Sequence, residues 1–419
     1  MKVARVAKIT KAVKMAQMPL ANKPLMKRTQ QMQQTYRRTY VEIDTSVLEA
    51  NVRTITQYYP YEYYIGVVKG NSYGHGIGSI EALIAGGINY LAVSSLDEAL
   101  AVREFYDLPL LILEPVHLDE LDICSQNNFS IIVHDKGYFE SMLKQGIEAE
   151  LNIHLKLDTG LNRLGLSNKD DIDFIYAQIE EHVHFKLEGI YTHFATSGIS
   201  DLRYKAQIDR FLALTADIDL AKIPLVHVDK SSTFAHHSKL SFVNAVRMGI
   251  IMFGFASKAP VWQGTLGKLR KLKREHLQKK LGIEGILYPD IELNTAYRFC
   301  SEILQIKAVS KGEYVGYGSS YQATEDILIA VVAVGFADGY SKRNTGSHVS
   351  INQKRYPIIG EVGMNMTIIK VDASVKLSDE VVLVGDAMPL RQASAHLGTN
   401  AYELMTMIDS SIPRVLKKD

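Results

Sequence analysis

Lys69 stands where an apolar run gives way to a glycine-rich turn, in the string Val67-Val68-Lys69-Gly70-Asn71-Ser72-Tyr73-Gly74-His75-Gly76. A lysine at the end of a buried strand is costly unless it reacts or pairs with an anion. Burial lowers the pKa of an amine, and a neutral amine is a nucleophile that can form a Schiff base. The alternative is a lysine whose ammonium group extends from the core to water. Spacing alone slightly favours this alternative.

Four further groups of polar residues end or interrupt apolar runs in the same way. They are Lys156 with Asp158, His193 in Tyr191-Thr192-His193-Phe194-Ala195, Lys230-Ser231-Ser232, and Arg247 in Val246-Arg247-Met248-Gly249-Ile250. Each group taken singly is more often structural than functional. Their shared place at the ends of apolar runs indicates one common site, provided that the runs are neighbouring strands.

The runs that carry these residues have the length and β-branched content of buried strands. There are eight of them: Ile65–Lys69, Tyr90–Ser95, Leu110–Glu114, Ser130–His134, Ile153–Leu157, Leu187–His193, Leu225–Val228 and Ala245–Ile250. Helical stretches precede and separate them, beginning with an amphipathic helix over Thr45–Tyr59. Strands that alternate with helices predict a parallel sheet. Eight such units predict a (β/α)8 barrel with its active site at the carboxyl ends of the strands.

From about Thr295 the pattern changes to short strands separated by glycine and polar turns, which predicts a mainly-β domain. The strand-like runs are Tyr297–Ala308, Ile327–Ala333, His348–Ile351, Tyr356–Val362, Met366–Val371 and Glu380–Val384. An early strand near Val41 is a candidate to join this domain, and Leu390–Ile408 is expected to be helical. The predicted domains are a barrel over 39–265, a basic linker over 266–294 and a C-terminal β domain over 295–419.

Composition is that of a soluble globular protein, with 47% hydrophobic and 22% charged residues among 419. The net charge of +1 gives no general case for a nucleic-acid partner. Residues 1–38 hold ten of the 47 Lys and Arg and no acid, which leaves 37 basic against 46 acidic residues elsewhere. We expect a disordered N-terminal extension rather than a targeting or nucleic-acid-binding segment. The basic segment Lys268–Lys280 is expected to be a solvated surface helix.

The chain has no apolar run near the roughly 20 residues needed to span a bilayer, so no membrane association is expected. Cys124 and Cys300 have no metal-binding or CxxC spacing. We therefore expect buried free thiols, a reducing compartment and a cytoplasmic location, with no metal site.

Motifs from Tyr40 to Val415 resemble those of the alanine racemases, which are fold-type III pyridoxal-phosphate enzymes, in residue types and in order. These motifs are the Lys69 string, Lys156-Leu-Asp158-Thr-Gly-Leu-Asn-Arg163-Leu-Gly165, Tyr191–Ala195, Val246–Ile250, Gly316-Tyr-Gly-Ser-Ser-Tyr321, Gly335-Phe-Ala-Asp-Gly-Tyr340, Val362-Gly-Met-Asn-Met366 and Ile412-Pro-Arg414. The resemblance implies interconversion of L- and D-alanine, with D-alanine destined for peptidoglycan.

The resemblance implies that Lys69 holds pyridoxal 5'-phosphate and acts as one acid/base group, and that Tyr321 acts on the opposite face of the substrate α-carbon. Two groups on opposite faces suit a reaction that removes a proton from one side and returns it to the other. Tyr321 and Met364 are implied to come from the second subunit, with the backbone N–H of Met364 near the substrate carboxylate. The implied protein is a homodimer with composite active sites.

The remaining roles also follow from the resemblance. Arg247 would donate to the cofactor pyridine nitrogen, and His193 would pack beside the ring and bond to Arg247. Arg163 would reach the phenolic oxygen and the substrate carboxylate. Lys156 stands where some relatives carry a carbamylated lysine. The residues implied to bind the phosphate are Tyr73, Ser231, Gly249 and Ile250.

Five positions depart from the family pattern. Lys230 replaces a usual asparagine, Ser410 a tyrosine that closes the pocket, and Phe336 a tyrosine of the access channel. Gly198 and Asn365 stand near positions that often carry acids. A serine in place of a large closing side chain suggests a wider pocket with tolerance for serine as substrate. The alternatives are a racemase of serine or another small amino acid, a different reaction on the same scaffold, such as a decarboxylase or an aldolase, and a cofactor-binding protein without turnover.

Overall fold

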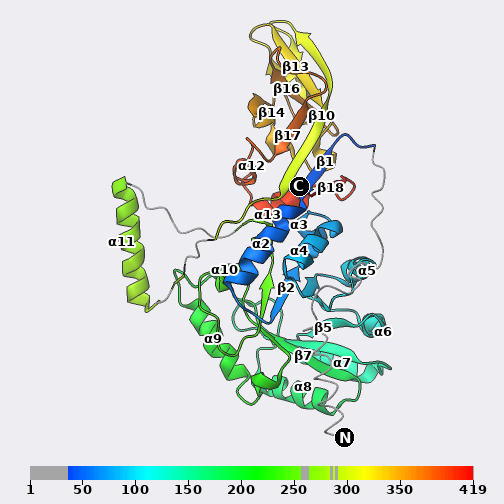
Figure 1. The fold of residues 1–419 in the computed structure, drawn as a ribbon, viewed down its shortest axis with the longest axis vertical. Helices are drawn as coiled ribbons and strands as arrows, with labels where there is room; N and C mark the ends of the chain where they lie inside the picture. Colours follow the sequence, from blue (N-terminus) through cyan, green and yellow to red (C-terminus); the bar gives the residue numbers. More distant parts are fainter. Residues whose placement is uncertain (1–35, 256–263, 284–285, 288–290, 419) are drawn as a thin grey trace.

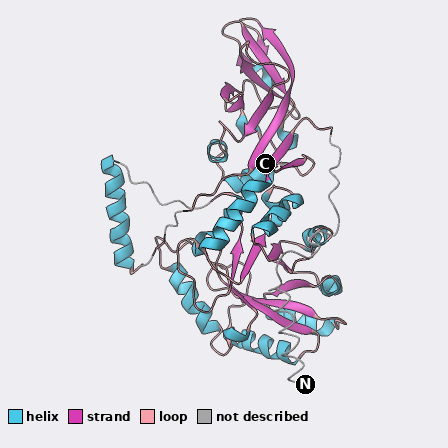
Figure 2. Ribbon diagram, in the orientation of Figure 1, coloured by secondary structure: helices cyan, strands magenta, loops and turns pink. Residues whose placement is uncertain are grey.

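The computed structural model describes residues 36–255, 264–283, 286–287 and 291–418. The molecule is elongated, with a barrel of strands and helices at one end and a β domain at the other (Figure 1). Figure 2 shows helices around the outside of the barrel, whereas strands dominate the second domain. The predicted fold class, a (β/α)8 barrel followed by a mainly-β domain, is confirmed.

Eight parallel strands form the barrel, in the order β8-β7-β6-β5-β4-β3-β2-β9. They are β2 (Tyr63–Val67), β3 (Tyr90–Val93), β4 (Leu110–Ile112), β5 (Phe129–Val133), β6 (Leu151–Lys156), β7 (Phe185–Tyr191), β8 (Leu225–His227) and β9 (Ala245–Met248). Each predicted run overlaps one strand. A parallel bridge between Lys230 and Arg247 joins the ends of β8 and β9, so that the barrel is nearly closed.

The helices of this domain, apart from the two shortest, cover the outside of the barrel (Figure 2). They are α2 (Thr45–Tyr58), α3 (Lys69–Tyr73), α4 (Ile80–Gly86), α5 (Leu96–Arg103), α6 (Leu121–Gln126), α7 (Lys136–Gln145), α8 (Lys169–Glu181), α9 (Arg203–Leu214) and α10 (Ser231–Phe234). Asp44, Ser95, Asp135 and Asn168 cap α2, α5, α7 and α8, because each side chain accepts a backbone N–H of the first turn.

The β domain is built on one long strand, β10, that pairs with different partners along its length. The strands are β10 (Tyr297–Val309), β11 (Tyr314–Val315), β12 (Tyr321–Gln322), β13 (Ile327–Val332), β14 (His348–Ile351), β15 (Lys354–Pro357), β16 (Thr367–Val371), β17 (Glu380–Val384) and β18 (Arg414–Lys417). Two helices, α12 (Leu390–His396) and α13 (Ala401–Met407), replace the continuous helical stretch that was predicted, because Gly398 has a positive φ of 70° between them.

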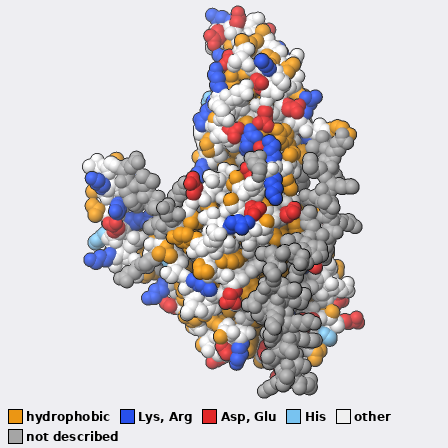
Figure 3. All heavy atoms as spheres, in the orientation of Figure 1, with side chains coloured by type: hydrophobic (Ala, Val, Ile, Leu, Met, Phe, Trp, Pro, Cys, Tyr) orange, Lys and Arg blue, Asp and Glu red, His pale blue; other side chains and the backbone are white. Residues whose placement is uncertain are grey.

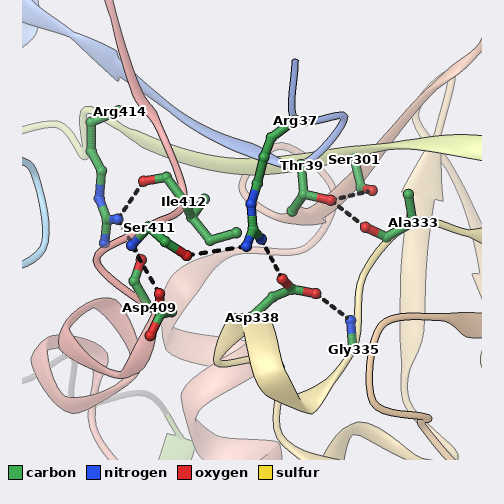
Figure 4. A network of polar contacts seen from close by, with 10 residues as sticks. All are labelled: Arg37, Thr39, Ser301, Ala333, Gly335, Asp338, Asp409, Ser411, Ile412 and Arg414. Carbon is green, nitrogen blue, oxygen red and sulfur yellow. Dashed lines mark hydrogen bonds and ion pairs between the residues drawn. The ribbon is translucent and has the colours of Figure 1, made fainter. Parts of the chain in front are cut away.

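The first and last described strands meet in this domain. β1 (Tyr40–Asp44) lies between β10 and β18, antiparallel to the former and parallel to the latter. Figure 4 shows the contacts beside it, where Arg37 Nη1 lies 2.6 Å from Asp338 Oδ1 and Nη2 donates to Ser411 Oγ at 3.2 Å. The expectation that an early strand near Val41 joins the β domain is confirmed. Residues 1–35 lie outside the described residues, and the disorder expected of them stays a prediction.

The linker contains α11 (Gly264–Leu281), which extends to one side of the body (Figure 1). Leu266, Leu269 and Leu272 are each more than 60% exposed, and basic side chains mark the helix on the face in Figure 3. This agrees with the expected surface helix. Cys124 and Cys300 are buried and free, as predicted. Among the described residues, no helix has the length and apolar character needed to cross a bilayer.

Candidate active site

A cavity of about 580 Å³ lies at the carboxyl ends of the barrel strands. Its wall includes every barrel residue that the sequence singled out for the cofactor or substrate: Lys69, Tyr73, Lys156, Arg163, His193, Ser231, Arg247, Gly249 and Ile250. The rest of the wall is formed by Val67, Ser94, Leu113, Glu114, Leu164, Tyr191, Lys230, Ser232 and Tyr402. The fold therefore collects in one cavity residues that are far apart along the chain.

Lys69 leads from β2 directly into α3, a short turn with a left-handed backbone. Gly70, Asn71, Ser72 and Tyr73 all have φ between 52° and 62°. This conformation costs a residue with a Cβ about 1–2 kcal/mol, so that three consecutive non-glycine residues in it need support from their surroundings. The sequence did not reveal this geometry, because only the surrounding structure can maintain it.

The support on the barrel side comes from hydrogen bonds to the turn. The Ser79 hydroxyl donates to Ser72 Oγ at 2.9 Å, and the backbone N–H of Gly70 donates to the Glu98 carboxylate at 2.7 Å. The Glu98 carboxylate also accepts from the backbone and hydroxyl of Ser94. These bonds fix the direction in which Lys69 leaves β2.

The support on the other side comes from the end of the chain. A Cβ on Gly74 would lie only 2.2 Å from the carbonyl oxygen of Met405, so α13 packs directly on the turn. Arg414 Nε donates to the Gly74 carbonyl at 3.0 Å. The C-terminal segment thus holds in place the loop that carries Lys69.

Two hydroxyls and a backbone N–H converge at one end of the cavity. The N–H of Gly249 lies 3.0 Å from Ser231 Oγ, and a Cβ on Gly249 would lie 2.8 Å from the Tyr73 hydroxyl. Only a glycine leaves this space open. Hydroxyls and backbone N–H groups of this kind bind phosphate. Burial raises the pKa of Tyr73 to about 12, so its hydroxyl keeps its proton and can donate.

Arg247 is buried at the carboxyl end of β9 and is fixed by several acceptors. Its Nη1 lies 2.6 Å from both Nδ1 and the carbonyl oxygen of His227, and its Nη2 donates to the Thr192 carbonyl at 2.7 Å. Burial lowers the pKa of Arg247 to about 10, so that the guanidinium remains charged at neutral pH. The sequence analysis missed His227, since it lies inside an apolar run and matches no pattern of its own.

His193 lies on the cavity wall with its Nδ1 3.4 Å from Arg247 Nη2. This separation is long for a hydrogen bond, and the contact between Arg247 and His227 is the shorter of the two. Burial and the charges of Arg247 and Lys230 lower the pKa of His193 to about 2. His193 is therefore neutral at any physiological pH.

Cations outnumber acids on the cavity wall, where Glu114 is the one acid facing Lys69, Lys156, Arg163, Lys230 and Arg247 among the described residues. Burial and the charges of Arg163 and Arg247 lower the pKa of Lys156 to about 8. The pKa of Lys230 is also lowered, by burial and by Arg247 and Arg163. An anionic ligand would relieve this repulsion, and the cavity is therefore suited to bind one.

Tyr191 presents a buried hydroxyl with no hydrogen-bond partner within the described part of the chain. Its ring stacks on His227 with centroids 4.6 Å apart and carries Lys156 and Arg247 over its π face. A buried hydroxyl without a partner is costly, and a bound ligand is one way to supply the partner.

Tyr321 and Met364 do not line this cavity. Tyr321 belongs to β12 in the β domain, and the side chain of Met364 is 59% exposed. Ser410 and Phe336 are also exposed and absent from the wall. A tyrosine that the sequence analysis did not consider, Tyr402 on α13, stands there instead.

Comparison with known proteins matches both domains to families. A profile for the alanine racemase N-terminal domain covers residues 43–257, and one for the alanine racemase C-terminal domain covers residues 296–416. Alanine racemases from Anoxybacillus flavithermus and Geobacillus kaustophilus are each 32% identical, over 92% of this chain and 96% of theirs.

Solved structures agree. An alanine racemase from E. faecalis has a TM-score of 0.78 at 31% identity, over 91% of this chain and 99% of that one. One from Bacillus anthracis with bound L-Ala-P has a TM-score of 0.79 at 27% identity, over 92% and 97% of the two chains. A histidine racemase from Leuconostoc mesenteroides subsp. sake, with a TM-score of 0.78 at 22% identity over 92% of this chain and all of that one, shares the fold.

The barrel, the cationic cavity and the β domain together define an amino-acid racemase, an isomerase of the two-domain barrel class. Within this class, the chain belongs to the alanine racemase family.

Proposed function

We propose that this protein racemises alanine with pyridoxal 5'-phosphate, by a two-base mechanism in a homodimer. The observation that carries the proposal is that Lys69, Arg163, Arg247 and the hydroxyls of Tyr73 and Ser231 line one cationic cavity. Its product, D-alanine, would supply peptidoglycan, and the enzyme would act in the cytoplasm. Deletion of the gene should then make growth dependent on added D-alanine.

The cavity fits the proposed cofactor. The space between the hydroxyls of Tyr73 and Ser231 would be filled by a Cβ at Gly249, so a glycine is needed to leave room for a phosphate. Five cations on the wall match an anionic ligand. Lys69 would hold the cofactor, which when bound supplies the electron sink that makes the substrate α-proton acidic.

The residues of this chain would then bind, orient and move protons. Arg247, held by His227 and Thr192, presents a charged donor that cannot give up its proton to a pyridine nitrogen at neutral pH. Arg163 offers a planar fork for a carboxylate. The amine of Lys69 takes or returns the α-proton on one face.

Tyr321, the second base that the resemblance implies, does not line the cavity of its own chain, and neither does Met364. Both lie in the β domain, Tyr321 in β12 and Met364 between β15 and β16. We propose that Tyr321 and Met364 of a second copy complete the site, so that two chains form two composite sites.

Mixing inactive variants tests the composite site directly. Neither Lys69→Ala nor Tyr321→Phe homodimers should racemise alanine. Random exchange of subunits would make half of the dimers mixed, each with one intact site, and restore about a quarter of wild-type activity. No recovery from a mixture that has demonstrably exchanged subunits would contradict the composite site.

The reaction itself is tested by α-proton exchange in D₂O, with L-alanine and L-serine offered separately and optical activity followed. Exchange with loss of optical activity on alanine supports the proposal. Exchange on serine alone would favour the alternative of a serine racemase. Cofactor binding without exchange on either substrate would favour the non-catalytic alternative.

Tolerance for serine was inferred from Ser410, and the cavity offers little support for it. Ser410 does not line the wall, whereas the larger Tyr402 does. A comparison with Ser410→Tyr should therefore leave the ratio of rates on alanine and serine unchanged.

A further inference from the structure

A chain of polar side chains runs from Arg247 into the interior of the barrel. His227 Nδ1 lies 2.6 Å from Arg247 Nη1, and its Nε2 lies 2.9 Å from Nδ1 of His154. The Nε2 of His154 lies 3.0 Å from the carboxylate of Glu188. Arg247, His227 and His154 are buried, and together with Glu188 they come from β9, β8, β6 and β7. The proposed reaction uses His227 only as a support for Arg247 and gives no role to His154 or Glu188.

The two ends of this chain fix the proton positions between them. A guanidinium can only donate, so His227 Nδ1 must accept and His227 must carry its proton on Nε2. That proton points at His154 Nδ1, which must then accept, and His154 carries its proton on Nε2. This last proton meets Glu188, which as a carboxylate can only accept. Both histidines are therefore neutral Nε2–H tautomers.

The carboxylate of Glu188 is held in its ionised form. Tyr90 donates to its Oε2 at 2.8 Å, and Ser130 donates to the same oxygen. Burial alone would raise the pKa of Glu188, but the hydrogen bonds that its carboxylate accepts from His154, Ser130 and Tyr90 lower it. Burial, followed by the charge of Arg247, holds the pKa of His227 well below its usual range. The barrel interior thus favours the one proton arrangement that makes Nδ1 of His227 an acceptor for Arg247.

We propose that Glu188 is a positioning residue for Arg247 and acts through His154 and His227. The carboxylate selects the histidine tautomers, and the tautomer of His227 fixes the guanidinium that faces the cofactor. With the opposite tautomer, an N–H of His227 would face an N–H of Arg247 at 2.6 Å, and the two would repel. The consequence for catalysis rests on the function proposed above, whereas the proton positions do not.

The direct test locates the protons in the holoenzyme. Neutron diffraction from deuterated crystals, or nitrogen NMR of ¹⁵N-histidine-labelled protein assigned with His154→Asn and His227→Asn, reports which ring nitrogen is protonated. We expect a proton on Nε2 and none on Nδ1 for both residues. A proton on Nδ1 of His227, or a doubly protonated His154, would overturn the inference, whatever reaction the protein catalyses.

The effect of Glu188 is tested with Glu188→Gln and Glu188→Met, against Glu181→Gln on the exposed surface of α8 as a matched control. We expect the two Glu188 variants to fold and to lose about tenfold in kcat, the scale of one charged hydrogen bond. The ¹⁵N signals of His227, the visible absorption of the bound cofactor and the ¹⁵N shift of its pyridine nitrogen should move in the variants and not in the control.

A purely structural role for Glu188 predicts a different result. Thermal stability would then fall while the His227 signals and the cofactor absorption stayed as in the wild type, and that outcome would refute the positioning role. A different outcome is that the wild-type protein shows the expected tautomers but does not racemise alanine. That outcome would refute the proposed function, whereas the inferred proton positions would still hold.

Discussion

Gly74 ends the turn that carries Lys69, and its replacement by alanine tests whether α13 supports that turn. Gly74 has a φ of +80°, which residues with a Cβ rarely adopt. A Cβ there would lie 2.2 Å from the carbonyl oxygen and 2.8 Å from the carbonyl carbon of Met405. Ordinary contacts begin at 3.4 Å. The backbone of α13 would therefore have to retreat by roughly 1 Å.

The cost of Gly74→Ala has two parts. The left-handed conformation costs an alanine about 1–2 kcal/mol. Displacing packed backbone costs about a further 1–3 kcal/mol, as in overpacked cores. We expect the free energy of unfolding to fall by about 2–5 kcal/mol, a large share of the stability of a typical protein.

Gly146 provides the matched control, because it separates the two parts. It has a similar φ of +71° after α7, but a Cβ there would meet nothing within 4 Å. Gly146→Ala should thus lose only the conformational part. Urea unfolding of both variants, followed by far-UV circular dichroism, measures the difference. Equal losses in the two variants would refute the claim that α13 rests on the turn.

Three other variants or conditions test the cavity wall. Tyr402→Phe should weaken cofactor binding about three- to tenfold, because it removes a hydroxyl beside Tyr73. Equilibrium dialysis measures the affinity, and an equal weakening in Ser410→Ala would contradict this prediction. Tyr191→Phe should raise the free energy of unfolding of the cofactor-free protein by about 1 kcal/mol, since the Tyr191 hydroxyl has no partner within the described residues. A clear loss of stability on urea unfolding would show that this hydroxyl has a partner. Because the folded pKa of Lys156 is lowered to about 8, its amine is protonated below that pH and neutral above it, and only the neutral amine adds CO₂, releasing a proton. A carbamate signal in ¹³C NMR with labelled bicarbonate should therefore increase as the pH rises through 8, and a signal of equal size at pH 6 and pH 9 would count against this.

Much of the fold could be predicted from the sequence, because buried strands are recognisable as short apolar runs rich in β-branched residues. The eight apolar runs fall on the eight barrel strands. The helix α6 was missed, since six residues are too few for helical periodicity to emerge. A strand was expected over Tyr356–Val362. The observed strand, β15, begins two residues before Tyr356, at Lys354, and ends at Pro357. The ends of such short strands and helices depend on packing against residues that are distant in the sequence.

The candidate site was less predictable where roles depend on contacts across the barrel. Lys69, Arg163 and Arg247 were found from their motifs and lie on one cavity wall. His227 and His154 lie within apolar runs, and nothing local marks them as partners of one another. Tyr402 could be recognised only once α13 was seen to pack on the Lys69 turn. Conformation and pairing at these positions are set by tertiary structure, and a linear pattern carries no sign of them.

The position of β1 between β10 and β18 has a consequence for synthesis of the chain. Tyr40 in β1 pairs with Cys300, about 260 residues later, and the other neighbour of β1, β18, follows later still in the sequence. At 5–20 residues per second, translation needs roughly 13 to 50 s to deliver the first of these partners. The nascent barrel therefore emerges from the ribosome with an unpaired strand on its leading end. Until β10 arrives, the backbone N–H and C=O groups on that side of β1 have no strand partner, and an unpaired strand edge can pair with another chain.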